Sequence, residues 1–208
     1  MNSGVRQAAP AEFTSVVALL AAAFADDPLV AAVAGAARDP AAARSAIFGA
    51  AVASARRAGA VLVEEHDGRL VGAALVLDPS AGPLRAAITR TVDGLRFLAA
   101  AARIGPELRL LNAADVAGRR LSPRTRHHFL VAVGVVASQR GAGVGRRLVE
   151  AAVARARTSH GLRLETENPA NAERYARWGF ELRGTLPVGP VTVFGMFRPT
   201  GDGGKERP

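Results

Sequence analysis

Two stretches near the start of the chain carry apolar residues at the spacing of an amphipathic helix. The first opens at Pro10 and Glu12, runs through Phe24 and is stopped by Asp26-Asp27-Pro28. The second spans residues 40–58 and is followed by a glycine. We expect a helix in each stretch, preceded by a short strand near residues 5–8.

The next stretches are typical of extended chain. Residues 61–65 and 70–77 are mostly apolar and are joined by His66-Asp67-Gly68-Arg69. Asp-Gly between two such runs predicts a hairpin, because the tight turn needs a positive φ that glycine adopts without steric cost. Residues 82–126 show helical spacing, with a break expected at Gly105-Pro106.

The second half of the chain alternates strands and helices. Residues 127–136 are almost wholly apolar and β-branched, which predicts a buried strand. Gly134 interrupts it, and we expect a bulge or a close approach of another chain or ligand there. A glycine-rich turn, a helix, a strand at 162–166, a helix at 170–178 and strands at 180–184 and 191–197 follow.

This order of elements predicts one α/β (α+β) domain over residues 1–199, with a central mixed sheet flanked by helices. Residues 82–126 are interpreted as a helical insertion. The segment 200–208 is rich in glycine and charge, and we expect it to be a disordered tail.

Charge and residue usage limit the function. The formal net charge is +9, from 27 Lys and Arg against 18 Asp and Glu, which suits an anionic partner such as nucleic acid, an acidic membrane face or a phosphorylated cofactor. A genome of high GC content, which encodes arginine and alanine wherever they are tolerated, would produce the same excess of positive charge. The chain has no cysteine and only four histidines, without a His-x-x-x-His pair, so no metal is expected.

The first residues lack a basic segment followed by an apolar one, and the longest apolar runs are too short to span a bilayer. We therefore expect a soluble cytoplasmic protein with no membrane partner.

The stretch VVASQRGAGVGRRL, residues 135–148, predicts a strand, a glycine-rich turn and a helix. Alternate glycines at Gly141, Gly143 and Gly145 let backbone N–H groups converge, and the helix adds the positive end of its dipole. Arg140 and Arg146 add charge suited to phosphate oxygens. A phosphate-binding loop of the kind that holds ATP or GTP would end in Gly-Lys-Ser/Thr, and this sequence is missing here. A turn that binds nothing is the alternative.

The motif Arg140-Gly141-Ala142-Gly143-Val144-Gly145, preceded by FLVAVGVV, resembles the coenzyme A signature Arg/Gln-x-x-Gly-x-Gly/Ala of the GNAT acyltransferase superfamily. A second stretch, LETENPANAERYARWGFEL at residues 164–182, resembles that superfamily's later strand, helix and Tyr-x-x-x-Gly-Phe element. These features, with Phe24-Ala25-Asp26-Asp27-Pro28, are similar to the branch that contains puromycin N-acetyltransferase.

The resemblance implies a sheet in which a splayed strand pair forms a slot for coenzyme A, with acetyl-CoA as cosubstrate. Backbone groups of Val133 and Val135 would pair with the pantetheine arm, and Asn171 would bond to the same arm or act only as a helix cap. The pyrophosphate would be held by the loop residues Arg140, Gly141, Ala142, Gly143, Val144, Gly145 and Arg146.

Amine acylation needs a proton acceptor for the amine and a donor for the departing thiolate. By the resemblance, Tyr175, the only tyrosine in the chain, is the expected donor; packing against Trp178 and Phe180 is its alternative role. Glu165 is the first choice for the base. His128 and Asp27 are weaker choices for it.

The function expected is transfer of acetyl from acetyl-CoA to a primary amine of a small molecule, by direct attack in a ternary complex. Two alternatives stay open: a coenzyme A-binding regulatory protein without turnover, and a basic nucleic-acid or ribosome-associated protein. The shortage of tyrosine and tryptophan argues against the nucleic-acid reading, because such surfaces use aromatic stacking. A homodimer also stays open.

Overall fold

A computed structural model describes residues 4–79, 105 and 107–200 of the chain. Most of the expected helical insertion, residues 82–104 and 106, lies outside the described residues, as does the segment 201–208. The described end of the insertion is helix α5, Leu108–Leu121, which Gly105 precedes with a φ of 85°. Thr200, assigned to the tail from sequence, is held by hydrogen bonds from its hydroxyl to the carbonyl of Ala156 and from its N–H to the carbonyl of His160.

Seven strands form one sheet in the order β1-β2-β3-β4-β5-β7-β6. All neighbours are antiparallel except β4 and β5, which are parallel, so the expected mixed and mostly antiparallel sheet is confirmed. The strands are β1 (Arg6–Gln7), β2 (Gly59–His66), β3 (Arg69–Leu77), β4 (His128–Val135), β5 (Gly161–Thr166), β6 (Glu181–Val188) and β7 (Val191–Pro199).

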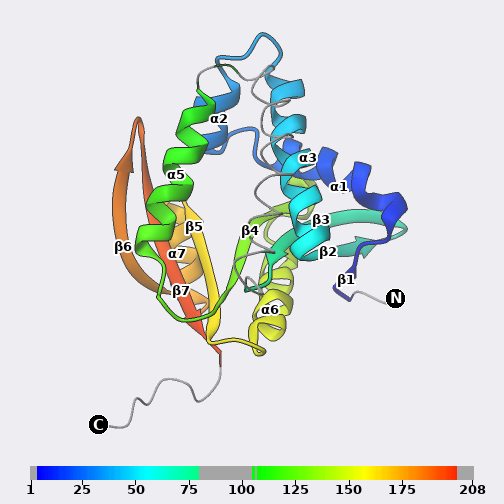
Figure 1. Cartoon of the computed structure of the whole chain (residues 1–208). Helices are drawn as coiled ribbons and strands as arrows, with labels where there is room; N and C mark the ends of the chain where they lie inside the picture. Colours follow the sequence, from blue (N-terminus) through cyan, green and yellow to red (C-terminus); the bar gives the residue numbers. More distant parts are fainter. Residues whose placement is uncertain (1–3, 80–104, 106, 201–208) are drawn as a thin grey trace.

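Helices cover both faces of the sheet (Figure 1). On one face α6 (Val144–Ala156) and α7 (Pro169–Arg177) bury the strands in a shared apolar cluster. The opposite face is covered by α1 (Phe13–Ala23), α2 (Pro28–Ala34), α3 (Pro40–Ala58) and α5. Two short 3-10 turns, η1 (Pro10–Glu12) and η2 (Ala137–Gln139), lead into α1 and the glycine-rich turn.

The alternation of β3 shows why the sheet has two buried faces. Ala73 and Leu75 pack among residues of α1 and α3, whereas Ala74 and Val76 pack among residues of α6. Successive side chains of a strand point to opposite faces, so small and branched apolar residues at every position suit a strand covered on both sides. The turn that leads into β3 has φ of 50° at Asp67 and 72° at Gly68, as the hairpin signal predicts.

Helix α2 has no counterpart among the elements expected from sequence. It starts at Pro28, which fits the first helical position because its missing N–H would have no partner there. Asp27 caps it: one carboxylate oxygen accepts the N–H groups of Leu29 and Val30, both at 3.1 Å. The same residues that end the first helical pattern therefore begin a new helix.

The bulge of β4 lies at Val131, not at Gly134 as the glycine suggested. The pairing with β3 passes from Leu130–Val76 directly to Ala132–Leu75, which leaves Val131 unpaired. Leu130 consequently packs with α6 while Ala132, two residues later, packs with α1. Gly134 instead allows a close approach, because a Cβ there would lie 2.9 Å from side-chain atoms of both Leu20 and Ala23.

Among the described helices, none is by itself long and apolar enough to cross a membrane. Only Pro10–Ala23 taken together with Pro28–Ala34, with a bend of 100° between them, has that length and composition.

Candidate functional site

The glycine-rich turn joins β4 to α6 and has the backbone of an anion site. Gly141 and Gly143 adopt φ of 85° and 81°, which residues with a Cβ rarely adopt, and α6 begins directly afterwards at Val144. No side chain caps this helix, and its first N–H groups have no partner within the helix. Gly145 already belongs to the first turn. Arg140 and Arg146 are exposed beside it.

Strands β4 and β5 separate beyond Leu130 and Leu164. They are paired only where His128 to Leu130 face Leu162 to Leu164, although both strands continue further (Figure 1). The N–H of Val136 donates to the carbonyl of Val71 at 2.9 Å. Because bonded positions alternate along an antiparallel pair, the backbone groups of Val133 and Val135 point away from β3, toward the side that β5 has left.

Tyr175 lies on α7 and is 9% exposed. Its ring packs edge-on against Trp178, with centroids 5.6 Å apart, and against Phe180 at 5.7 Å, so the packing role is present. Among the described residues none forms a hydrogen bond with its hydroxyl. Burial raises the pKa of the phenol above its usual value, and the negative charge of Asp27 adds to the rise. Tyr175 therefore keeps its proton over the neutral range.

Asn171, on the same helix, is partly engaged within that helix. The side-chain oxygen accepts a hydrogen bond from Arg174. The helix cap is Asn168, whose side chain accepts the N–H of Ala170 at 3.0 Å. The capping role considered for Asn171 therefore belongs to Asn168.

Glu165 points from β5 toward α5 and forms an ion pair with Arg163. A Cβ at Gly118 of α5 would lie 1.8 Å from a Glu165 carboxylate oxygen, so the glycine makes room for this side chain. Burial raises the pKa of the Glu165 carboxyl to about 6, against the opposing charge of Arg163. The Glu165 carboxyl group is thus paired with Arg163 and covered by α5.

His128, an alternative base, lies where β4 and β5 are still paired, at the closed end of the gap. It is buried, with Nδ1 2.8 Å from the hydroxyl of Ser159 and Nε2 3.4 Å from Asp78. Burial lowers its pKa. These contacts hold the His128 side chain at the closed end of the gap.

Glu167 is the candidate that the sequence analysis missed. It follows the end of β5, two residues after Glu165, and is only partly exposed. Burial, followed by the charges of Asp27 and Glu165, raises the pKa of its carboxyl group to about 8. Charged residues at every second position, Arg163, Glu165 and Glu167, were the sequence pattern that could have pointed to it. A carboxyl group with such a pKa in a partly open gap is a candidate functional group.

Asp27, the N-cap of α2, interacts electrostatically with this group. Burial raises the pKa of its own carboxyl group, opposed by the N–H groups that it accepts at the start of α2. Its charge acts on both Glu167 and Tyr175. Asp27, Glu167 and Tyr175 therefore form one electrostatic cluster, in which Glu167 follows the end of β5 that has separated from β4. Within the residues that the structure describes, no group of three His, Asp or Glu side chains is arranged to hold a metal ion.

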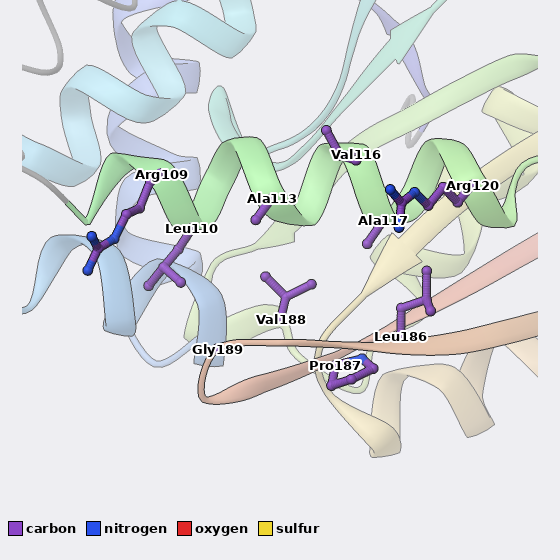
Figure 2. Close-up of a pocket in the computed structure, with 10 residues that line it drawn as sticks. All are labelled: Arg109, Leu110, Ala113, Val116, Ala117, Arg120, Leu186, Pro187, Val188 and Gly189. Carbon is purple, nitrogen blue, oxygen red and sulfur yellow. The ribbon is translucent and has the colours of Figure 1, made fainter.

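A separate groove of about 560 Å³ lies between α5 and the β6–β7 hairpin. Figure 2 shows its apolar floor, with Arg109 and Arg120 toward its two ends. None of the candidate residues of the loop or the gap lines it. The lining residues are Arg109, Leu110, Ala113, Val116, Ala117, Arg120, Leu186, Pro187, Val188 and Gly189.

Comparison with known proteins agrees with this geometry. The family model for the acetyltransferase (GNAT) family matches residues 38–180, which include the loop, the gap and Tyr175. No curated protein matches the chain in sequence. A Corynebacterium glutamicum structure described as histone acetyltransferase HPA2 and related acetyltransferase is 25% identical, with a TM-score of 0.73 over 97% of this chain and 98% of that one.

Two more distant structures share the fold. A Drosophila melanogaster polyamine N-acetyltransferase is 22% identical, with a TM-score of 0.55 over 93% of this chain and 97% of that one. The yncA protein of Salmonella typhimurium, solved with its cofactor acetyl-CoA, is 17% identical, with a TM-score of 0.57 over 100% of this chain and 98% of that one.

Proposed function

Because the chain belongs to the acetyltransferase (GNAT) family and is an acetyl-CoA-dependent N-acetyltransferase, we propose that it acetylates the primary amine of a small molecule. The observation that carries the proposal is the gap between β4 and β5. At its open end the turn that follows β4 can bind an anion, and Glu167, which follows β5, belongs to a cluster of two carboxyl groups and a phenol.

The residues of the loop and the gap fit coenzyme A. We assign the pyrophosphate to the N–H groups of Gly141 and of residues 143–145, with Arg140 and Arg146 adding positive charge. The N–H of Ala142 is already donated to the carbonyl of Gln139 at 3.2 Å. The backbone groups of Val133 and Val135 offer an unpaired strand edge to the amides of the pantetheine arm. The side chain of Asn171 keeps its N–H₂ group for the same arm, since only its oxygen is engaged by Arg174.

The bound acetyl thioester supplies the activated carbonyl carbon. Glu167 takes a proton from the ammonium form of the acceptor, so that the neutral nitrogen can form the C–N bond while the C–S bond breaks. Tyr175 gives its proton to the departing sulfur and recovers one from the second N–H of the amine. A pKa of about 8 makes Glu167 a stronger base than an ordinary carboxylate.

We prefer Glu167 to Glu165 as the base because Glu165 is neutralised by Arg163 and covered by α5. Asp27 has a supporting role, since its charge keeps Glu167 basic. Direct attack in a ternary complex suits this chain, which has no cysteine to carry an acetyl group. Initial rates measured over both substrates should give intersecting double-reciprocal lines; parallel lines would indicate an acetylated enzyme instead.

The acidic side of the gap favours a cationic acceptor. The similar Drosophila enzyme catalyses the formation of N-acetylagmatine. The motifs at residues 24–28 and 164–182 also support placement near the puromycin N-acetyltransferase branch. An acceptor panel should therefore compare monoamines, diamines, agmatine, puromycin and aminoglycosides with a peptide that has a free N-terminus. Faster acetylation of small amines than of the peptide is expected, and preference for the peptide would contradict the proposal.

A further inference from the structure

An ion pair between a buried carboxylate and a half-exposed guanidinium ties the start of α6 to β2. Glu64 of β2 is 1% exposed, and its carboxylate accepts three hydrogen bonds from Arg147 of α6, with N–O distances of 2.6, 3.0 and 3.1 Å. These three charge-assisted bonds from one guanidinium fix the direction of the Arg147 side chain. A Cβ at Gly72 would lie 2.6 Å from Val144 and 2.8 Å from Leu148, so this glycine lets the start of α6 come close to the sheet.

The same guanidinium also holds the turn itself. Nη1 of Arg147 donates to the carbonyl of Ala142 at 3.1 Å. The missing side chain of Gly143 makes this possible, because a Cβ there would lie 2.9 Å from that nitrogen. In a trans peptide the C=O and the following N–H point in opposite directions. Drawing the Ala142 carbonyl inward therefore turns the Gly143 N–H outward, away from the sheet.

We propose that Glu64 and Arg147 are positioning residues for the coenzyme: they hold the Ala142–Gly143 peptide with its N–H toward the pyrophosphate. This inference rests on the proposed binding of the pyrophosphate by the turn. Glu64 acts only through Arg147, because it is buried on β2 and bonds to no residue of the turn itself.

Glu64→Gln tests the inference most cleanly. Gln keeps the size of the side chain and one acceptor oxygen but removes the charge that orients Arg147. Calorimetric titration of the purified full chain should compare coenzyme A with pantetheine, which lacks the pyrophosphate. We expect the affinity for coenzyme A to fall about tenfold, the loss of a hydrogen bond to a charged group, while that for pantetheine is unchanged.

A matched control lies on the same helix. Arg155 donates two hydrogen bonds, at 2.8 and 2.7 Å, to Asp78, and this pair has no contact with the turn. Asp78→Asn should leave the ratio of the two affinities at its wild-type value, whatever it does to the melting temperature. Arg147→Lys, which keeps the charge but not the fork, should lower the ratio as Glu64→Gln does.

An unchanged ratio in both folded variants, Glu64→Gln and Arg147→Lys, would overturn the positioning role while leaving the proposed function intact. An equal fall in affinity for both ligands would also overturn it, since it would indicate a general loss of structure. If the wild-type chain itself binds coenzyme A no better than pantetheine, the turn does not hold the pyrophosphate, and the assignment of the site fails first.

Discussion

The charge of Asp27, at the N-terminus of α2, acts on Glu167, directly after β5, and raises the pKa of the Glu167 carboxyl group. Burial is the larger cause, and together they bring that pKa to about 8. Two acidic side chains thus share a site in which only one ionises easily. A cation placed between them would relieve the repulsion, which is why the site suits an amine.

Activity should rise with pH as Glu167 loses its proton. The base is active when ionised, so kcat/KM is expected to increase through about pH 8 in the wild-type chain. Glu167→Gln should lower kcat by about 10²-fold or more, the usual contribution of a general base. The pH profiles of both proteins should be measured with amines of different pKa. A rise in activity that moves with the pKa of the amine belongs to the substrate, and a rise that does not move belongs to the enzyme.

Glu165→Gln is the comparison for this variant, because it changes the same kind of side chain two residues earlier, on β5. Glu165 is paired with Arg163, so a smaller loss of kcat is expected. A larger loss in Glu165→Gln than in Glu167→Gln would return the role of base to Glu165.

The same pKa has a consequence for stability. The folded chain holds the Glu167 proton up to about pH 8, whereas the unfolded chain releases it near the ordinary value of 4.5. The stability that the proton confers is complete below pH 4.5 and is lost as the pH rises toward 8. Glu167→Gln should therefore gain stability relative to the wild type over this range, on the order of a few kcal/mol. Urea unfolding at several pH values measures the difference; a constant difference would contradict the burial of an ionisable Glu167.

Tyr175→Phe should lower turnover and leave coenzyme A binding unchanged. The ring contacts with Trp178 and Phe180 survive in phenylalanine, so the fold is expected to be kept. Only the proton donor is removed. Steady-state kinetics with a calorimetric titration of coenzyme A check both parts, and full turnover in this variant would reject Tyr175 as the acid.

Gly143→Ala should weaken coenzyme A binding. Alanine in the left-handed region costs about 1–2 kcal/mol, and the new Cβ would meet the Arg147 guanidinium. If the turn relaxes to avoid that cost, the affinity falls by about tenfold.

Gly68→Ala is the control for this substitution. Gly68 has a φ of 72°, and a Cβ there meets no atom within 4 Å. It lies in the β2–β3 hairpin rather than in the turn, so the same backbone strain should lower stability without changing coenzyme A affinity. Equal affinity loss in both variants would mean that the turn has no special role.

Much of this architecture could be predicted from local patterns. The helix at Pro40–Ala58, the Asp67-Gly68 hairpin and the positive φ of Gly141 and Gly143 each depend on residues close in sequence. The bulge at Val131 could not be predicted, because it is a property of the register between β4 and β3 rather than of the glycine nearby.

The proposed base, Glu167, was not expected from sequence for a related reason. The pKa of Glu167 depends on Asp27, which is distant in sequence, and on burial that only the packed helices create. Glu165, two residues before Glu167 and on β5, carries the same carboxyl group. Only the positions of Arg163 and Gly118 show that Glu165 is already engaged.

The most direct measurement is the release of thiol from acetyl-CoA by the purified chain, with and without a cationic primary amine, and with mass spectrometry of the amine. We expect amine-dependent thiol release and a product that carries one acetyl group on nitrogen, both reduced in Glu167→Gln. Thiol release that does not depend on any amine would contradict acetyl transfer to a small amine. Absence of thiol release with the whole panel, despite coenzyme A binding, would contradict it as well.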